Sequence, residues 1–274
     1  MRRLFRNLSL DRNPGWVFIL PSLVLISLLG LPLLALVWRA IGKDFFGYVL
    51  SPVALSALKL SLLTSTVSVL IALAAGTPLA YILARWNFRG KTALELLIDL
   101  PVILPPSVAG LALLIAFGRQ GVFGIWINKI GITLPFTTAA VVIAQTFVSA
   151  PLFVRSAHVG FAEIDKKLEE AATVEGANEW QVFRFVMFPL AGRALLTGLV
   201  LTWTRAMGEF GATILFAGNL EGKTQTMPLA IYLGFERGLG VAIALSVMLI
   251  VVSILLLTIL RRLERRSSVA MQDI

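Results

Sequence analysis

Two charged residues at the end of an apolar stretch, Arg205 within it and Glu209 just beyond it, are candidates for chemistry in this chain. Their spacing of four residues would place both side chains on one face of a helix. An ionisable residue at membrane depth is a functional candidate by default, whereas opposite charges at this spacing also neutralise each other. We therefore predict that the pair either shapes a gate or only holds its helix in place, with Thr213 as a nearby hydroxyl donor.

Side chains that perform covalent or metal chemistry are scarce. The chain has no cysteine and one histidine, His158, so neither a thiolate site nor a multi-histidine metal site can form. An intramembrane enzyme would need a nucleophile with its base, or a metal cluster. We expect no metal, no cofactor and no catalytic residue, and we interpret His158 as a residue near a membrane surface.

One stretch, residues 217–224, fits a relaxed phosphate-binding loop. It begins with Ala217 instead of glycine, and Pro228 follows closely where the helix of such a loop should begin. Nucleotide binding by this chain is therefore not expected.

The composition is that of a membrane protein. Of the 274 residues, 58% are hydrophobic and 14% are charged, against roughly 25% charged residues in soluble chains. The net charge is +9, but no basic stripe interleaved with aromatic residues indicates nucleic-acid binding. The basic N-terminus runs into an apolar stretch that is too long for a signal peptide, so a retained first span is expected.

Six apolar stretches are long enough to cross a bilayer as helices, which takes about 20 residues. They lie near residues 16–38, 57–84, 94–117, 134–157, 185–206 and 239–260. Sixteen Lys and Arg residues fall on the side of the N-terminus and seven on the other, with Arg205 within the fifth stretch completing the 24. Because positive residues are retained in the cytoplasm, both termini and the loop 158–184 are predicted to be cytoplasmic.

Prolines are densest in the third stretch, where Pro101 is followed by Pro105, Pro106 and Ser107. Each proline removes a backbone donor and breaks the helical hydrogen-bond ladder. The third helix is therefore predicted to be bent or interrupted beside a central pathway. The alternative is an ordinary proline kink buried in a bundle, since proline is common in membrane helices.

The cytoplasmic loop has the pattern of two short helices. Asp165 is available as an N-cap, and apolar residues recur at helical spacing up to about Glu175. Gly176 is predicted to end this helix in the left-handed conformation. Asn178 and Gln181 resemble a capping box at the start of the second helix, in which Trp180, Phe183 and Met187 would share a face.

This loop resembles the EAA-x3-G-x9-I-x-L-P loop of ABC importer permeases. The matching residues are Glu170, Ala171, Ala172, Gly176, Val186, Phe188 and Pro189, with Val186 and Phe188 departing conservatively from the usual Ile and Leu. The resemblance implies an all-α polytopic protein with six transmembrane helices and the type I importer architecture. It also implies that Glu170, Ala171, Ala172 and Gly176 form a coupling helix that docks onto a cytoplasmic ATP-binding subunit. The alternative is an amphipathic helix lying at the membrane surface.

Further stretches resemble the molybdate branch of the same family. They are residues 100–110, 117–121, 205–213, 216–219 and 223–232. Sulfate permeases share the Gly-Glu-Phe/Tyr-Gly and Ala-Gly-Asn segments, so molybdate is expected, with tungstate and sulfate left open. The candidate pathway or gate residues are Pro105, Pro106, Ser107, Arg205, Glu209 and Thr213.

The resemblance divides the chain into three parts. Residues 1–55 would hold an N-terminal cytoplasmic segment, the first span and an external loop; residues 56–260 the permease core with five spans and the coupling loop 158–184; and residues 261–274 a cytoplasmic tail. The expected partners are a second copy of the chain, two copies of the ATP-binding subunit, an extracytoplasmic oxyanion-binding protein and the lipid bilayer. An ion-coupled secondary transporter would instead show inverted repeats and paired intramembrane carboxylates, and neither is found in the sequence.

Overall fold

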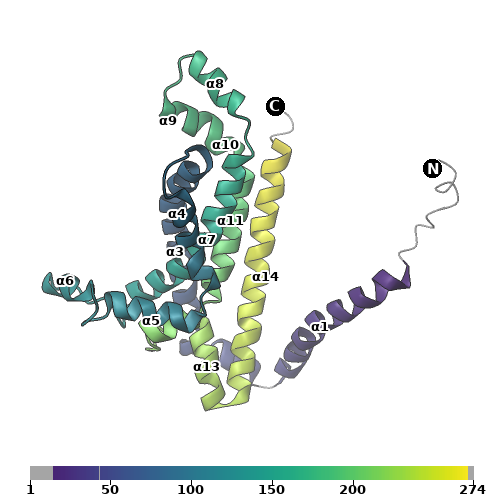
Figure 1. Cartoon of the computed structure of the whole chain (residues 1–274). Helices are drawn as coiled ribbons and strands as arrows, with labels where there is room; N and C mark the ends of the chain where they lie inside the picture. The colour runs from purple at the N-terminus through teal and green to yellow at the C-terminus, as the bar shows by residue number, and fades with distance from the viewer. Residues whose placement is uncertain (1–14, 43, 271–274) are drawn as a thin grey trace.

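The computed structural model describes residues 15–42 and 44–270. The predicted cytoplasmic N-terminal residues 1–14 and the end of the predicted tail, 271–274, lie outside the described residues. Within the described part every regular element is a helix (Figure 1). The elements are α1 (Trp16–Ala40), α2 (Phe45–Val49), α3 (Pro52–Arg85), α4 (Lys91–Ile103), α5 (Pro106–Phe117), α6 (Gly124–Lys129), α7 (Thr138–Ala162), α8 (Lys166–Val174), α9 (Glu179–Val182), the π-helix η1 (Phe183–Met187), α10 (Phe188–Leu190), α11 (Gly192–Met207), α12 (Gly211–Phe216), α13 (Met227–Arg237) and α14 (Leu239–Ala270).

Four helices in the described residues are individually long and apolar enough to cross a membrane: α1, α3, α7 and the Leu239–Thr258 part of α14. Two further spans form only if each of two bent helix pairs is taken as one. These pairs are α4 with α5, bent by 115°, and Glu179–Leu190 with α11, bent by 69°. Counted in this way, the predicted six-span, all-α architecture is confirmed.

The interruption predicted in the third span lies at the proline pair. α4 ends at Ile103, Leu104 is extended with ψ 139°, and α5 restarts at Pro106. A proline forces the residue before it out of the helical region, whereas proline at the first helical position has no amide to leave unpaired. Pro105 and Pro106 therefore end one helix and begin the next in a new direction, and the predicted bend is confirmed.

Small residues allow α3, α7 and α11 to pack closely. α3 buries a face of Ser61, Ser68, Ala72 and Ala80, and α7 buries a row of alanines on its own inner face. A Cβ atom added at Gly160 of α7 would lie 2.3 Å from the Cβ of Ala194 in α11. Small side chains at helix contacts let backbones approach and gain dispersion energy where water provides no driving force. These three helices pack against one another, and the segment that follows α7 from residue 163 projects from them.

The first and last helices lie at the edge of this body. No residue of α1 is buried, and α1 leans away from the bundle beside α14 (Figure 1). α14 continues helically to Ala270, ten residues beyond the predicted end at residue 260. Its far end lies at the same end of the bundle as α8 and α9, while α13 lies at the opposite end (Figure 1).

Candidate functional sites

The first helix of the loop 158–184 is capped at both ends. At its start, the Asp165 carboxylate accepts a hydrogen bond from the Lys167 amide at 3.0 Å. At its end, Gly176 adopts φ +91°, its amide donates to Thr173 O at 3.0 Å, and the Ala177 amide donates to Ala172 O at 3.0 Å. This pair of bonds is the Schellman arrangement, which satisfies the last carbonyls of a helix. Both predicted caps are confirmed.

The second helix also starts as predicted. The Asn178 side chain accepts from the Gln181 amide at 2.9 Å, and the Gln181 side chain accepts from the Asn178 amide at 2.8 Å, which completes the capping box. The helix then widens into a π-helical turn at η1, which the sequence pattern did not predict. Met187 is fully buried, and Phe183 packs on the same core, but Trp180 stacks on Phe183 while staying 64% exposed.

The two faces of α8 differ in chemistry. Ala172 packs on the core cluster of α3 and α7, and Glu169 contacts Arg85 of α3. Glu170, Ala171 and Gly176 are exposed on the outer side. Val174, at 85% exposure, adds to this outer surface an apolar side chain that was not predicted to belong to it. Of the four motif residues, three therefore face outward, and Ala172 faces the bundle.

The candidate pathway residues from two distant segments meet. A Cβ atom added at Gly211, the first residue of α12, would lie 2.6 Å from the Pro106 Cβ and 3.4 Å from the Ser107 backbone nitrogen. A Cβ atom at Gly110 would likewise lie 2.9 Å from the Ala212 Cα. The starts of α5 and α12 are thus in direct backbone contact. This contact joins Pro105, Pro106 and Ser107 to the segment that contains Glu209 and Thr213.

Arg205 and Glu209 are paired, but not on one helix. α11 ends at Met207 with Gly208 as its C-cap, so the predicted shared helical face is wrong, because Glu209 lies in the break before α12. The Glu209 Oε2 atom still contacts Arg205 Nη1 at 2.6 Å, and its Oε1 atom accepts from the Ala212 amide at 2.8 Å. The Glu209 side chain is 1% exposed and that of Arg205 34%. One carboxylate thus pairs with a cation and caps the next helix.

Some polar side chains near the break between α11 and α12 have hydrogen-bond partners, and others have none among the described residues. The Thr204 hydroxyl donates to the Val200 carbonyl of its own helix at 2.9 Å. Thr213 is fully buried, and no hydrogen-bond partner of its Oγ1 atom is found among the described residues. Gln145 of α7 is also buried, and its Nε2 atom has no hydrogen-bond partner among the described residues. Gln145 was not predicted as a site residue, although a glutamine in the middle of an apolar stretch is itself a signal.

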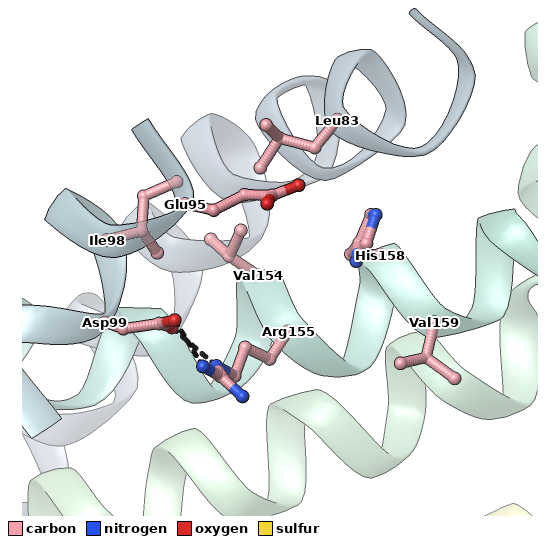
Figure 2. A pocket seen from close by; sticks show the side chains of 8 residues that line it. All are labelled: Leu83, Glu95, Ile98, Asp99, Val154, Arg155, His158 and Val159. Atoms are coloured by element: carbon pink, nitrogen blue, oxygen red, sulfur yellow. Dashed lines mark hydrogen bonds and ion pairs between the residues drawn. The ribbon is translucent and has the colours of Figure 1, made fainter. Parts of the chain in front are cut away.

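A second polar cluster lies between α4 and α7. A cavity of about 250 Å³ lies there, and Figure 2 shows His158 and Glu95 among the side chains that line it. The Arg155 guanidinium donates two hydrogen bonds to the Asp99 carboxylate at its edge. His158 is half-buried in this cavity wall. Within residues 15–42 and 44–270, no group of three or more acidic or histidine side chains is arranged to hold a metal ion.

The Asp99–Arg155 pair is expected to contribute little to stability. The Arg155 side chain is 65% exposed, whereas that of Asp99 is 17% exposed. Because the cation is exposed, we expect the pair to behave as an exposed ion pair, which contributes about 0–1 kcal/mol to the free energy of unfolding. Asp99→Asn should therefore lower that free energy by less than about 1 kcal/mol, measured by denaturant unfolding in detergent. Arg155→Gln and the double variant complete the cycle. A coupling energy above about 2 kcal/mol between the two positions would contradict this expectation.

Comparison with known proteins relates this geometry to a family. Residues 76–269 match the sequence profile of the family described as "binding-protein-dependent transport system inner membrane component". Over 242 residues the chain is 40% identical to "Molybdenum transport system permease protein ModB" of Mycobacterium tuberculosis, which covers 88% of this chain and 91% of that protein. It is 39% identical over 241 residues to "Probable sulfate transport system permease protein cysT" of Chlorokybus atmophyticus, covering 86% and 84% of the two chains.

A solved structure shows the same fold. The crystal structure of a bacterial ABC transporter involved in the import of the acidic polysaccharide alginate contains a chain that matches with a TM-score of 0.77 at 19% identity. The match covers 92% of this chain and 94% of that one.

Proposed function

The chain belongs to the family of binding-protein-dependent transport system inner membrane components, and on that premise we propose that it is the membrane-spanning permease of an ATP-driven importer for a tetrahedral oxyanion, molybdate. The identity to a molybdenum transport permease over most of both chains supports molybdate as the substrate. As a permease of this kind it is not itself the ATPase, and the energy comes from a separate subunit.

The observation that carries this proposal is the capped helix α8 with its outward-facing surface of Glu170, Ala171 and Val174. Small side chains let a partner backbone approach closely, and the caps at Asp165 and Gly176 fix the helix that presents them. Six of the 15 acidic residues of the chain lie between residues 163 and 179. A basic groove on the ATP-binding subunit would complement this surface.

The proposed mechanism uses two copies of the chain about a two-fold axis, each resting α8 on one of two ATP-binding subunits. Closure of those subunits on ATP moves the two α8 helices together and opens the pathway outward. An extracytoplasmic binding protein then delivers the anion, and hydrolysis restores the inward-facing state. The excess of Lys and Arg on one side supports cytoplasmic termini and a cytoplasmic α8.

The proposed gate is the contact between the starts of α5 and α12. Backbones in direct contact at Pro106 and Gly211 leave no room for an anion until the two helix starts separate. Arg205 lies in the adjoining segment as a hydrogen-bond donor, together with the Thr213 hydroxyl, for which the described part of the chain offers no partner. Because Glu209 neutralises Arg205, the site would offer donors without holding the anion as tightly as an unpaired cation.

Reconstitution tests both the class and the substrate. The chain, its ATP-binding subunit and its binding protein are incorporated into liposomes, and ATP hydrolysis and anion uptake are measured with molybdate, tungstate and sulfate. Molybdate is expected to stimulate hydrolysis most, and uptake should stop when ATP is withheld. Stronger stimulation by sulfate would reassign the substrate. Uptake by the chain alone, driven by an ion gradient, would instead indicate a secondary transporter.

A further inference from the structure

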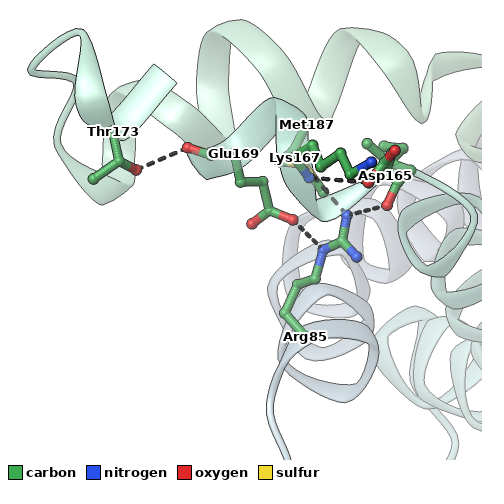
Figure 3. Close-up of polar contacts among 7 residues, drawn as sticks. Arg85, Asp165, Lys167, Glu169, Thr173 and Met187 are labelled. Atoms are coloured by element: carbon green, nitrogen blue, oxygen red, sulfur yellow. Dashed lines mark hydrogen bonds and ion pairs between the residues drawn. The ribbon is translucent and has the colours of Figure 1, made fainter. Parts of the chain in front are cut away.

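The last residue of α3, Arg85, contacts the loop 158–184 at two places and Met187 just beyond its end (Figure 3). Its Nε atom lies 2.6 Å from the Glu169 carboxylate of α8. Its Nη2 atom donates to the Ile164 carbonyl, in the turn before α8, at 2.8 Å and lies 3.8 Å from the Met187 sulfur of η1. A single guanidinium therefore contacts the turn before α8, α8 itself and the segment that leads on to α11.

These contacts are made by a buried cation. The Arg85 side chain is 7% exposed and that of Glu169 is 21% exposed. A charged side chain is rarely buried unless it is paired, and removing one partner of a buried pair leaves the other charge uncompensated. The planar fork of arginine can contact several acceptors in fixed directions, which a lysine ammonium cannot do.

Apolar packing near Arg85 ties α3 to α7 and η1, whereas α8 adds one partly buried side chain, Ala172, to the same core cluster. One turn earlier on α3, the Tyr81 ring packs edge-on against Phe161 at 5.5 Å and Phe183 at 5.1 Å. None of the residues of α8 is buried. A cavity of about 340 Å³ lies beside it, lined in part by Tyr81, Arg85 and Glu169. The attachment of α8 to α3 at this point is therefore largely polar.

The other half of α3 reaches the proposed gate. The Ser65 hydroxyl contacts the sulfur of Met207, the residue at which α11 ends before the break at Glu209. The Ser61 hydroxyl accepts a hydrogen bond from the Met227 amide at the start of α13, at 2.7 Å. One continuous helix of 34 residues thus contacts α8 at one end and both flanks of the α12 segment nearer the other.

From this arrangement we propose that Arg85 is a positioning residue for energy coupling. It ties α8 to the end of α3, so that a displacement of α8 imposed by the ATP-binding subunit moves α3 and, through Ser61 and Ser65, the gate segment. The proposal rests on the proposed function, because it needs an ATPase that pushes on α8. It assigns to Arg85 a role distinct from docking, since Arg85 contacts Glu169, whereas the docking surface consists of Glu170, Ala171 and Val174, of which only Glu170 lines the same cavity as Arg85.

The test compares transport with hydrolysis in the reconstituted complex of permease, ATP-binding subunit and binding protein. Arg85→Ala is expected to leave the complex assembled and hydrolysing ATP, while the anion transported per ATP hydrolysed falls by about tenfold, within the usual range of coupling energies. Arg85→Lys keeps the charge but not the planar fork of the guanidinium. Its transport per ATP hydrolysed should lie between that of the unaltered complex and that of Arg85→Ala. Arg89→Ala is the matched control, because Arg89 is exposed four residues further along the same segment.

A covalent replacement separates coupling from simple folding of the loop. The chain has no cysteine, so Arg85→Cys combined with Glu169→Cys provides a unique thiol pair for a short bismaleimide cross-linker. Cross-linking is expected to restore the transport per ATP that the uncross-linked double variant lacks. Three results would overturn the proposal: unchanged coupling in Arg85→Ala, loss of ATP-binding-subunit co-purification in parallel with uptake, or failure of the cross-link to restore coupling. Absence of ATP-driven uptake by the unaltered complex would contradict the proposed function instead.

Discussion

Replacement of Gly176 by valine is expected to abolish anion uptake by the reconstituted importer while leaving membrane insertion intact. Gly176 has φ +91°, and no neighbouring atom lies within 4 Å of a Cβ atom added there. The expected effect is therefore conformational and not steric. A side chain in the left-handed region costs about 1–2 kcal/mol, and a β-branched one is especially unfavourable there. Loss of this conformation removes the two hydrogen bonds that end α8, so the docking surface loses its fixed direction.

Gly131→Val is the matched control for this prediction. Gly131 also has a positive φ, +82°, and open space around its Cβ position, but it follows α6, far from α8 in the sequence. The same backbone strain should therefore leave uptake largely unchanged. The measurement is uptake together with co-purification of the ATP-binding subunit. Normal uptake by Gly176→Val, or equal losses in both variants, would refute the assignment of α8 as the coupling helix.

Features determined by neighbouring residues were predictable from the sequence. The caps at Asp165, Gly176 and Asn178 each depend on hydrogen bonds that reach no more than five residues along the chain. The break at Pro105 and Pro106 follows from proline chemistry alone. These features do not need the tertiary structure, so the caps of the two short helices in the loop 158–184 and the bend of the third span were predicted correctly, whereas the π-helical turn η1 was not.

Features determined by distant contacts were not predictable in the same way. Two complete predicted spans lie between Arg85 and Glu169 in the sequence, and nothing in their local pattern indicates that the two side chains meet. The end of α11 at Met207 agrees with the predicted end of the fifth stretch near residue 206, but the shared helical face of Arg205 and Glu209 was wrong, because four-residue spacing shows which residues would share a face only if the helix continues. Gly208 and Gly211 were the available signals for that break. No helix was predicted between residues 206 and 239, where α13 lies, although Thr226, Pro228 and Gly238 mark the ends of that helix.

Removal of the Glu209 carboxylate is expected to have the largest effect on stability. Glu209→Ala leaves a partly buried Arg205 without its charge partner and the Ala212 amide without its acceptor. Breaking a buried pair by removing one partner lowers the free energy of unfolding by about 3–5 kcal/mol. We expect a lower thermal unfolding midpoint in detergent and no uptake. Asp99→Asn, which breaks a more exposed pair, is the control, and its thermal unfolding midpoint should be close to that of the unaltered protein.

The neutral double variant Arg205→Gln with Glu209→Gln separates the two roles that the sequence left open for this pair. The side-chain carbonyl introduced at position 209 can still accept from the Ala212 amide, and no uncompensated charge remains, so most of the unfolding midpoint lost in Glu209→Ala should return. If the guanidinium also guides the anion through the contact between α5 and α12, uptake should remain about tenfold lower, since one charge-assisted hydrogen bond contributes about 1.5–3 kcal/mol. We expect this separation, because Arg205 retains 34% exposure beside a proposed gate where Glu209 is almost fully enclosed. Uptake that recovers in step with the unfolding midpoint would show that the pair only holds α11 and α12 together.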